Sequence, residues 1–205
     1  MSWRFIIDHP LMGAARDTES PSVEITSEAP EIVNSPFSVT ITFSEDVIDF
    51  IVDDITVTGG SAGDFVSVSA SVYTATITPG ISGQIGVQIG AGACTDLSAN
   101  PNLASNLFIC IADLDAPTCI VSSEADDPVY APFSVTFTFS ENVTGFTVDD
   151  ITVTNGVASG FVAVSASIYT ATIAPEASGA VTVSVDAGVC QDTVGNLNEA
   201  SNALS

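Results

Sequence analysis

Oxygen-bearing side chains recur in two sets of positions, and each member of one set lies 96 residues from its counterpart in the other. The later set comprises Asp113, Asp115, Glu141, Asp192, Asn196 and Asn198. The earlier set comprises Asp17, Glu19, Glu45, Asp96, Asn100 and Asn102. Calcium takes six to eight oxygen ligands at about 2.3–2.6 Å. Each set is therefore a candidate calcium site, and a structural alternative stays open because Asp and Asn also stabilise turns by bonding their own backbone.

The charge balance of the chain favours cations as partners. Its 205 residues include 25 acidic residues and only two basic ones, Arg4 and Arg16, which gives a formal net charge of -23. The basic surface that binds phosphate backbones is missing, so we expect no binding to nucleic acid or anionic lipid. A solvated acidic surface, as in a secreted or salt-adapted protein, explains the same charge without a metal. No apolar run approaches the roughly 20 residues of a membrane span, so no membrane insertion is expected.

Residues for enzymatic catalysis are hard to assemble from this sequence. The single histidine, His9, lies near the N-terminus outside both sets, so neither a Ser-His-Asp nor a Cys-His arrangement forms within them. The paired carboxylates at 53–54 and 149–150 resemble a general acid and base, but they recur at equivalent places, which indicates a structural role. The sequence therefore predicts a protein that is not an enzyme.

The two sets of oxygen-bearing residues belong to a duplicated domain. Residues 36–58 recur as 132–154, and residues 71–79 recur as 167–175, without gaps and at the same period of 96. A period near 100 residues indicates a duplicated domain, since solenoid repeats are about 20 to 50 residues long. The chain then divides into an N-terminal extension of residues 1–16, repeat 1 of residues 17–112 and repeat 2 of residues 113–205.

The hydrophobic periodicity within each repeat is that of β-strands. Apolar and polar residues alternate from Phe37 to Phe43, as in a half-buried strand, and helical spacing is nowhere sustained. Short β-branched runs separated by turn residues predict eight strands in repeat 1, at 22–26, 37–43, 47–51, 54–58, 64–69, 72–78, 84–90 and 104–111. This spacing predicts an all-β protein made of two tandem Ig-like β-sandwich domains.

An Ig-like sandwich explains how each set of oxygen ligands is brought together. The incoming linker, the loop after the second strand and the loop before the last strand all gather at one end of such a domain, here called its N-terminal pole. Each set draws its members from these three segments. The later set is thus placed at the junction of the repeats, where bound calcium would stiffen the hinge.

The motifs of repeat 2 resemble a known family. The runs TFSENVTGF, DDITVTNG, YTAT and GNLN are similar to those of bacterial-type Ig-like repeats from large adhesins and biofilm surface proteins. Repeat 1 departs from the pattern, with Asp49 in place of Gly145 and SANPN at 98–102 in place of VGNLN at 194–198. The resemblance implies an Ig-like fold, an extracellular or cell-surface location and calcium-stiffened rods, and it implies no reaction.

Four cysteines in an exported type of protein suggest disulfides rather than metal ligands. Cys119 begins the first predicted strand of repeat 2 and Cys190 ends its penultimate strand. Both are expected at the N-terminal pole, within the roughly 4.4–6.8 Å between Cα atoms that a bridge requires, so a Cys119–Cys190 disulfide is predicted. Val23 stands at the equivalent place in repeat 1. Cys94 and Cys110 are therefore left free or pair between molecules.

The last strand of repeat 2 is incomplete in this sequence. Repeat 1 ends in the strand at 104–111, whereas only residues 200–205 remain for its counterpart, which leaves an apolar groove and unpaired backbone groups. The N-terminal extension carries an apolar run that looks like the end of repeat 1, with Trp3, Phe5, Ile6 and Ile7 as its apolar residues. We expect this run to serve as a donor strand that completes repeat 2 of a neighbouring copy. The alternative is that the chain is a segment of a longer array, and the run is the stub of a preceding domain.

Two functions follow from these observations. The first is a non-catalytic extracellular structural protein that polymerises with itself, head to tail, by donor-strand complementation, because a contact that does not close on itself generates a filament. The second is a stalk module of a large calcium-dependent cell-surface adhesin. Calcium is the one cofactor expected in either function.

Overall fold

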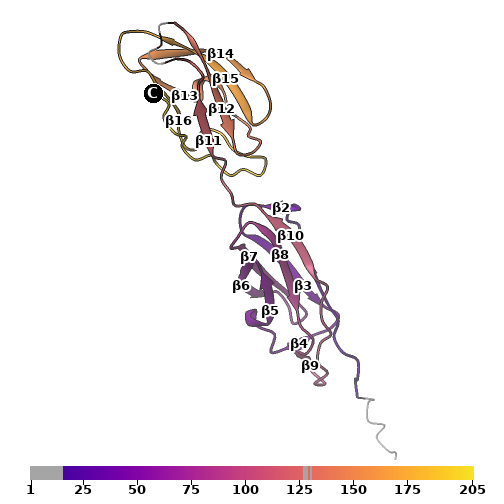
Figure 1. Cartoon of the computed structure of the whole chain (residues 1–205). Helices are drawn as coiled ribbons and strands as arrows, with labels where there is room; N and C mark the ends of the chain where they lie inside the picture. Colours follow the sequence, from indigo (N-terminus) through magenta and orange to yellow (C-terminus); the bar gives the residue numbers. More distant parts are fainter. Residues whose placement is uncertain (1–15, 127–128, 130) are drawn as a thin grey trace, which may run out of the picture.

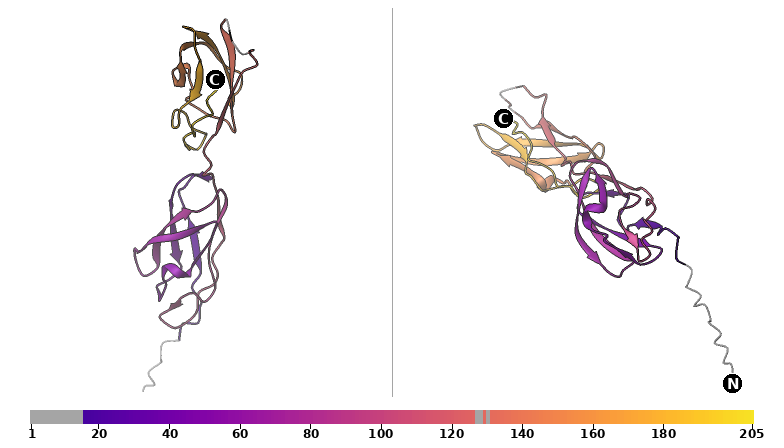
Figure 2. Two further views of the ribbon diagram at one scale, coloured as in Figure 1. Left: turned by 60° about the vertical axis from the view of Figure 1, so that its left-hand side comes forward. Right: turned by 90° about the horizontal axis from the view of Figure 1, so that it is seen from below.

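The structure is a computed structural model that describes residues 16–126, 129 and 131–205. The candidate donor strand with Trp3, Phe5, Ile6 and Ile7 lies outside these residues, so it stays a prediction. Figure 1 shows two β-sandwiches joined end to end by a short linker, and the views in Figure 2 agree with this arrangement. None of the described residues forms a helix that is long and apolar enough to cross a membrane.

Repeat 1 is a sandwich of two four-stranded sheets, with strand orders β1-β3-β7-β6 and β2-β10-β8-β5, and a small β4-β9 pair at its N-terminal pole. A 3-10 turn, η1 at Val52–Asp54, precedes the fifth strand. The strands are β1 Val23–Thr26, β2 Ile32–Val33, β3 Phe37–Phe43, β4 Val47–Ile48, β5 Ile55–Thr58, β6 Gly60–Ser67, β7 Val72–Pro79, β8 Gly83–Ile89, β9 Thr95–Asp96 and β10 Phe108–Ala112.

The core of each repeat follows from the alternation of apolar residues. In β3 every second side chain is buried, and Val39 and Ile41 are fully enclosed between the two sheets. Phe43, Phe50 and Tyr73 pack edge to face with ring centroids 5.0–5.9 Å apart. Their counterparts in repeat 2 pack in the same way. Edge-to-face packing of this kind adds about 0.5–1.5 kcal/mol per pair beyond the apolar area that it buries.

Repeat 2 has the same first sheet and a smaller second one. The first sheet has the order β11-β12-β15-β14, whereas the second contains only β13 and β16 among the described residues. A single bridge joins Val183 to Leu204 where repeat 1 has the whole of β10. The elements are β11 Cys119–Ser122, β12 Phe133–Phe139, η2 Val148–Asp150, β13 Ile151–Thr154, β14 Gly156–Ala163, β15 Ile168–Pro175 and β16 Thr182–Val185.

Three predicted strands of repeat 1 differ clearly from the observed ones, and the short strands β2 and β9 were not predicted. The strand expected at 64–69 is observed as β6, which begins four residues earlier, at Gly60. The strand expected at 47–51 ends at Ile48, because Asp49 has a φ of 65° in the left-handed region and turns the chain. The strand expected at 104–111 begins only at Phe108. Before it, the Asn106 side chain accepts the Ile25 N–H and donates to the Ile25 carbonyl, so side-chain hydrogen bonds replace backbone pairing there. The all-β fold with two Ig-like sandwiches is confirmed.

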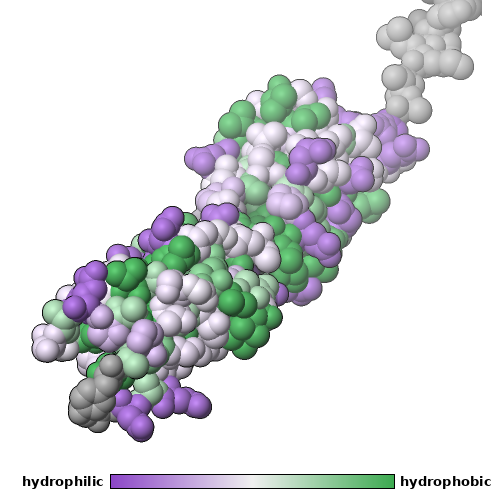
Figure 3. Space-filling view, turned by 90° about the horizontal axis from the view of Figure 1, so that it is seen from above, coloured by the Kyte–Doolittle hydropathy of each residue, from purple (hydrophilic) through white to green (hydrophobic). Residues whose placement is uncertain are grey.

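The surface of the chain mixes apolar and polar residues. Figure 3 shows apolar groups scattered between hydrophilic ones over the face in view. Exposed apolar residues at equivalent places in the two repeats include Val68 and Val164, which are 63% and 62% exposed. Single exposed apolar residues are normal on folded domains, so we assign no binding role to Val68 or Val164.

Candidate metal sites at the poles of the repeats

Three carboxylates meet at the N-terminal pole of each repeat. In repeat 1 one carboxylate oxygen each of Asp17, Glu45 and Asp96 lies within 4.8 Å of the other two. Asp113, Glu141 and Asp192 form the same arrangement in repeat 2. These sets are here called the repeat 1 triad and the repeat 2 triad. The members of each come from the incoming linker, from the loop that carries Glu45 or Glu141, and from the segment that carries Asp96, at the end of β9, or Asp192. The loops that an Ig-like sandwich gathers at this pole therefore do bring these sequence-predicted residues together.

The buried aspartate of each triad is held by its own turn. In repeat 2 one Asp192 oxygen accepts backbone N–H groups of Val194, Gly195 and Asn196 at 2.6–2.9 Å. The other oxygen accepts the Asn196 side-chain amide at 2.8 Å. Burial by itself raises the pKa of Asp192, but these hydrogen bonds outweigh it and place the pKa below its ordinary value of 3.8. The turn thus holds an ionised carboxylate at a fixed position.

Asp113 connects repeat 2 directly to repeat 1. Its backbone N–H donates to the Val33 carbonyl of repeat 1 at 2.9 Å, whereas its carbonyl accepts the Asn196 side chain of repeat 2 at 2.9 Å. Its carboxylate belongs to the repeat 2 triad. Asp17 has the matching bond from Asn100 in repeat 1, at 3.2 Å. A cation bound to the repeat 2 triad would therefore coordinate Asp113, the residue at which the two repeats meet.

The ionised form of the glutamate in each triad is destabilised by burial and by the neighbouring carboxylates. Burial, followed by the charges of Asp192 and Asp113, raises the pKa of Glu141 above its ordinary value of 4.5. Burial and then Asp17 do the same to the pKa of Glu45. A carboxyl group whose pKa is higher in the folded state disfavours folding once it is ionised. Its contribution to stability therefore falls as the pH rises from 4.5 through the raised pKa.

The substitution Glu141→Gln distinguishes between two interpretations of the repeat 2 triad, a metal site and a solvated turn. In the absence of divalent metal at pH 7 it should raise the free energy of unfolding of repeat 2 by about a few tenths of a kcal/mol, because one of three mutually repelling charges is removed in a partly solvated place. In the presence of calcium the same variant should be less stable than the parent chain. Urea unfolding in EGTA and in calcium measures both effects.

Glu199→Gln is the matched control, because Glu199 is exposed and lies outside both triads. It should change neither measurement by more than about 0.5 kcal/mol. Equal behaviour of the two variants in calcium would contradict a metal site at the repeat 2 triad.

The donor set fits calcium. The linker aspartate and the glutamate of each triad offer up to four oxygen atoms. The Asp96 or Asp192 oxygen that accepts only the Asn side-chain amide keeps a lone pair for a metal and is a fifth, and water would complete the coordination. Glu19 and Asp115 lie outside the triads, although their charges contribute to the raised pKa values of Glu45 and Glu141. Asn100 and Asn196 act as donors, so they position the triads. These four residues were predicted as ligands, and direct coordination of a metal by them stays a prediction.

Asn102 and Asn198 were wrongly grouped with the ligands. Both side chains are 2% exposed, and both bond the backbone inside their own repeat. The Asn198 oxygen accepts the N–H groups of Val189 and Cys190 at 2.9 Å, and its amide donates to two carbonyls at 2.8–2.9 Å. Their burial within a polar run has no signature in a single sequence, because buried and exposed asparagines in a turn-rich segment look alike.

The predicted Cys119–Cys190 disulfide is not formed in the structure. All four cysteines are free and buried, and each belongs to the hydrophobic core of its repeat. Burial raises the pKa of Cys119 to about 12 and that of Cys190 to about 11, so both are protonated at neutral pH. Val23 fills the place of Cys119 in repeat 1, which marks this position as one for apolar packing.

One carboxylate of each pair at 53–54 and 149–150 has a structural role. Asp54 accepts the Ile51 N–H at 2.9 Å and holds the start of η1. Asp150 accepts the Thr147 N–H at 2.7 Å and does the same for η2.

The fold is that of two tandem Ig-like sandwiches, each with a carboxylate triad at its N-terminal pole. A model of the bacterial Ig-like domain matches residues 17–108 and again residues 113–205. The chain therefore belongs to the bacterial Ig-like domain family, and the resemblance seen in its motifs is confirmed. No curated protein sequence matches the chain.

Several solved structures resemble the chain at low sequence identity. InvD of Yersinia pseudotuberculosis is 19% identical, with a TM-score of 0.32, over 90% of this chain and 57% of InvD. Invasin, a bacterial integrin-binding protein, is 16% identical, with a TM-score of 0.38, over 79% of this chain and 36% of invasin. The human OSCAR ligand-binding domain is 10% identical, with a TM-score of 0.30, over 90% of this chain and 98% of that domain. The chain spans less than two thirds of the length of InvD and of invasin.

Proposed function

We propose that the chain is a non-catalytic structural spacer of an extracellular or cell-surface protein, and that calcium bound to the triads makes its tandem sandwiches rigid. The observation that carries this proposal is Asp113. It bonds repeat 1 through its backbone and joins the repeat 2 triad through its carboxylate. A bound ion would neutralise the triad and hold the linker, the Glu141 loop and the Asp192 turn together.

The same arrangement at Asp17 extends the proposal to a longer array. Asp17 enters repeat 1 as Asp113 enters repeat 2, and it belongs to an equivalent triad. A domain placed before repeat 1 would therefore meet a carboxylate site of the same kind. Such an array is a rod whose stiffness depends on calcium at each junction, which suits a spacer that holds a binding domain away from a cell.

A distance measurement between the repeats tests the spacer. Spin labels at Val68→Cys and Val164→Cys report on repeats 1 and 2 from exposed positions. The native thiols are buried, and burial raises the pKa of Cys94 to about 11, so labels should go to the introduced cysteines. We expect a narrow distance distribution in calcium and a broad one in EGTA.

Asp113→Asn in the labelled chain is the critical variant for this measurement. It keeps the backbone bond to Val33 and removes one charge of the repeat 2 triad, so the distribution should be broad in both conditions. The parent chain, treated with the same spin label, measures the background from its native cysteines. A distribution that is equally narrow with and without calcium would count against the spacer.

A second candidate function is a subunit of a head-to-tail filament assembled by donor-strand complementation. It is suggested by the second sheet of repeat 2, in which, among the described residues, Leu204 forms the one bridge at the place that β10 occupies in repeat 1. A strand supplied by a neighbouring copy would complete this sheet and link the two subunits.

A further inference from the structure

A turn of repeat 2 lies against repeat 1 beside the linker. At the end of repeat 1 that faces the linker there is a hollow of about 390 Å³, which is lined by the loop before β3, including Asn34. Thr193 and Val194 of repeat 2 line the same hollow. We call residues 193–195 the junction turn and residues 29–36 the junction loop. The two repeats therefore meet through these segments as well as through the linker.

The two segments approach each other closely at Gly195. A Cβ atom at this residue would lie 3.4 Å from the side-chain nitrogen of Asn34. Gly195 is half-buried, whereas its counterpart in repeat 1, Ala99, is exposed. This difference in exposure indicates that repeat 1 covers part of the junction turn.

The facing parts of the two segments carry no charge. Residues 34–36 are asparagine, serine and proline, and residues 193–195 are threonine, valine and glycine. The chain as a whole has a net charge of -23, and like charges placed face to face would push the two repeats apart. The contact is therefore free of the repulsion that two acidic surfaces of this chain would meet.

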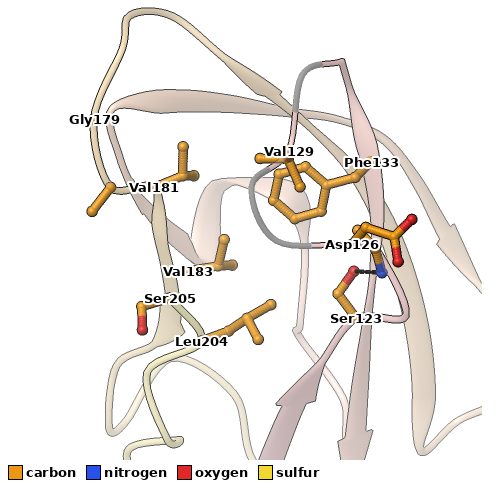
Figure 4. Close-up of a pocket in the computed structure, with 11 residues that line it drawn as sticks. Ser123, Asp126, Val129, Phe133, Gly179, Val181, Val183, Leu204 and Ser205 are labelled. Carbon is orange, nitrogen blue, oxygen red and sulfur yellow. Dashed lines mark hydrogen bonds between the residues drawn. The ribbon is translucent and has the colours of Figure 1, made fainter.

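Repeat 1 holds the junction loop in a fixed position. At its start, the Ser27 hydroxyl accepts the Ala29 N–H at 3.1 Å. Towards its end, the side chains of Val33 and Phe37 are fixed in the core, at 5% and 8% exposure. Ser123 forms the first of these anchors again in repeat 2, where its hydrogen bond is drawn in Figure 4. The junction loop is therefore a preformed surface.

Repeat 2 and the linker hold the junction turn in the same way. The N–H groups of Val194 and Gly195 donate to the Asp192 carboxylate at 2.8 and 2.6 Å. On the linker, the Leu114 N–H donates to the Ser82 hydroxyl of repeat 1 at 3.0 Å. The linker is one point about which repeat 2 could rotate. The junction turn adds a second point of contact beside it, so the two together limit that rotation.

We infer that the junction turn is the docking surface of repeat 2, that its partner is the junction loop of repeat 1, and that their contact sets the angle between the repeats. The proposed function concerns how firmly the junction is held. This inference goes beyond it, because it names the two protein surfaces that meet, and their contact is made by protein atoms alone.

Chemical cross-linking in the 205-residue chain tests the contact. Asn34→Cys and Thr193→Cys place two thiols on the walls of one hollow, so a short bis-maleimide should join them within a single chain. The native cysteines are buried, and the parent chain treated in the same way measures their reaction. The mass of the intact chain, after free thiols are capped, counts the linked product. We expect an internal link both in calcium and in EGTA.

Asn34→Cys with Leu97→Cys is the matched control. Leu97 is the counterpart of Thr193 and is 79% exposed, but it lies at the opposite end of repeat 1 from the junction loop (Figure 1). Strands of seven to eight residues make the repeat about 25 Å long. The short cross-linker cannot span that distance, so the control should give capped thiols and no internal link.

Asn34→Trp tests whether the contact sets the angle. The indole is too large for the space beside Gly195, so the junction turn cannot seat on the loop. In the chain labelled at Val68→Cys and Val164→Cys, the mean distance between the labels should shift in calcium. Leu97→Trp places the same side chain away from the junction and should leave the distance unchanged. Circular dichroism checks that both variants are folded, as expected for substitutions in loops.

Three results would overturn the inference: no internal link in Asn34→Cys with Thr193→Cys, an equal yield of link from the Leu97→Cys pair, or an unshifted distance in Asn34→Trp. The parent chain separates this inference from the proposed function. A distance distribution that calcium narrows, without an internal link, rejects the docking surface alone. An internal link, with a distribution that is the same in calcium and in EGTA, rejects the calcium-dependent spacer alone.

Discussion

Asn198→Ala should lower the free energy of unfolding of repeat 2 by about 3–5 kcal/mol, because it deletes a buried amide that satisfies several backbone groups at once. The side chain accepts two N–H groups and donates to two carbonyls, and it is 2% exposed. Each buried backbone group that loses its partner costs about 1–3 kcal/mol. Since a domain is stable by only about 5–15 kcal/mol, most of the stability of repeat 2 is at stake.

The measurement is thermal or urea unfolding of the variant beside the control Asn142→Ala. Asn142 is exposed and makes none of the side-chain hydrogen bonds seen for the described residues, so its replacement should fall within about 0.5 kcal/mol of the parent. Repeat 1 has its own core and should unfold unchanged in both variants. Equal free energies of unfolding for Asn198→Ala and Asn142→Ala would contradict a stabilising role of the buried Asn198 amide.

Calcium at 100 times its dissociation constant should stabilise each repeat by about 2.7 kcal/mol, because the ion binds the folded triad and not the unfolded chain. For domains of this size, 1 kcal/mol shifts the unfolding temperature by about 4–8 °C, so the shift should exceed 10 °C. The two repeats have separate cores and can unfold separately, so each transition is followed on its own.

Variants of single triads assign the two shifts. Asp192→Asn should remove the calcium shift of repeat 2 and leave that of repeat 1, and Asp96→Asn should do the reverse. Unfolding curves that are superimposable in calcium and in EGTA would show that neither triad binds the ion.

Much of the fold could be predicted from the sequence because the repeat and the alternation of apolar residues report directly on buried faces. The strand at 37–43 is observed at the predicted residues, and the triads assemble from the three segments that an Ig-like topology gathers. The period of 96 served as an internal comparison, since a residue that has the same type in both copies reflects a demand of the fold or of a shared site.

The failures have physical causes that the pattern does not carry. Cys119 and Cys190 look like a disulfide pair by their topology, but both fill the core as apolar side chains. Asn198 was predicted as a ligand because it lies two residues from Asn196. In the structure the Asn198 side chain is buried, whereas the Asn196 side chain donates to the Asp113 carbonyl. Alternation also misses strand ends, which at Asp49 depend on a backbone conformation and at Asn106 on a side chain that replaces a ladder.

Calorimetric titration of the intact chain with calcium counts the ions that it binds. Two ions per chain are expected, one for each triad, and one ion for Asp192→Asn or for Asp96→Asn. A chain with both substitutions should bind none. Retention of both ions by the doubly substituted chain, or absence of binding to the parent chain, would contradict the assignment of calcium to the triads.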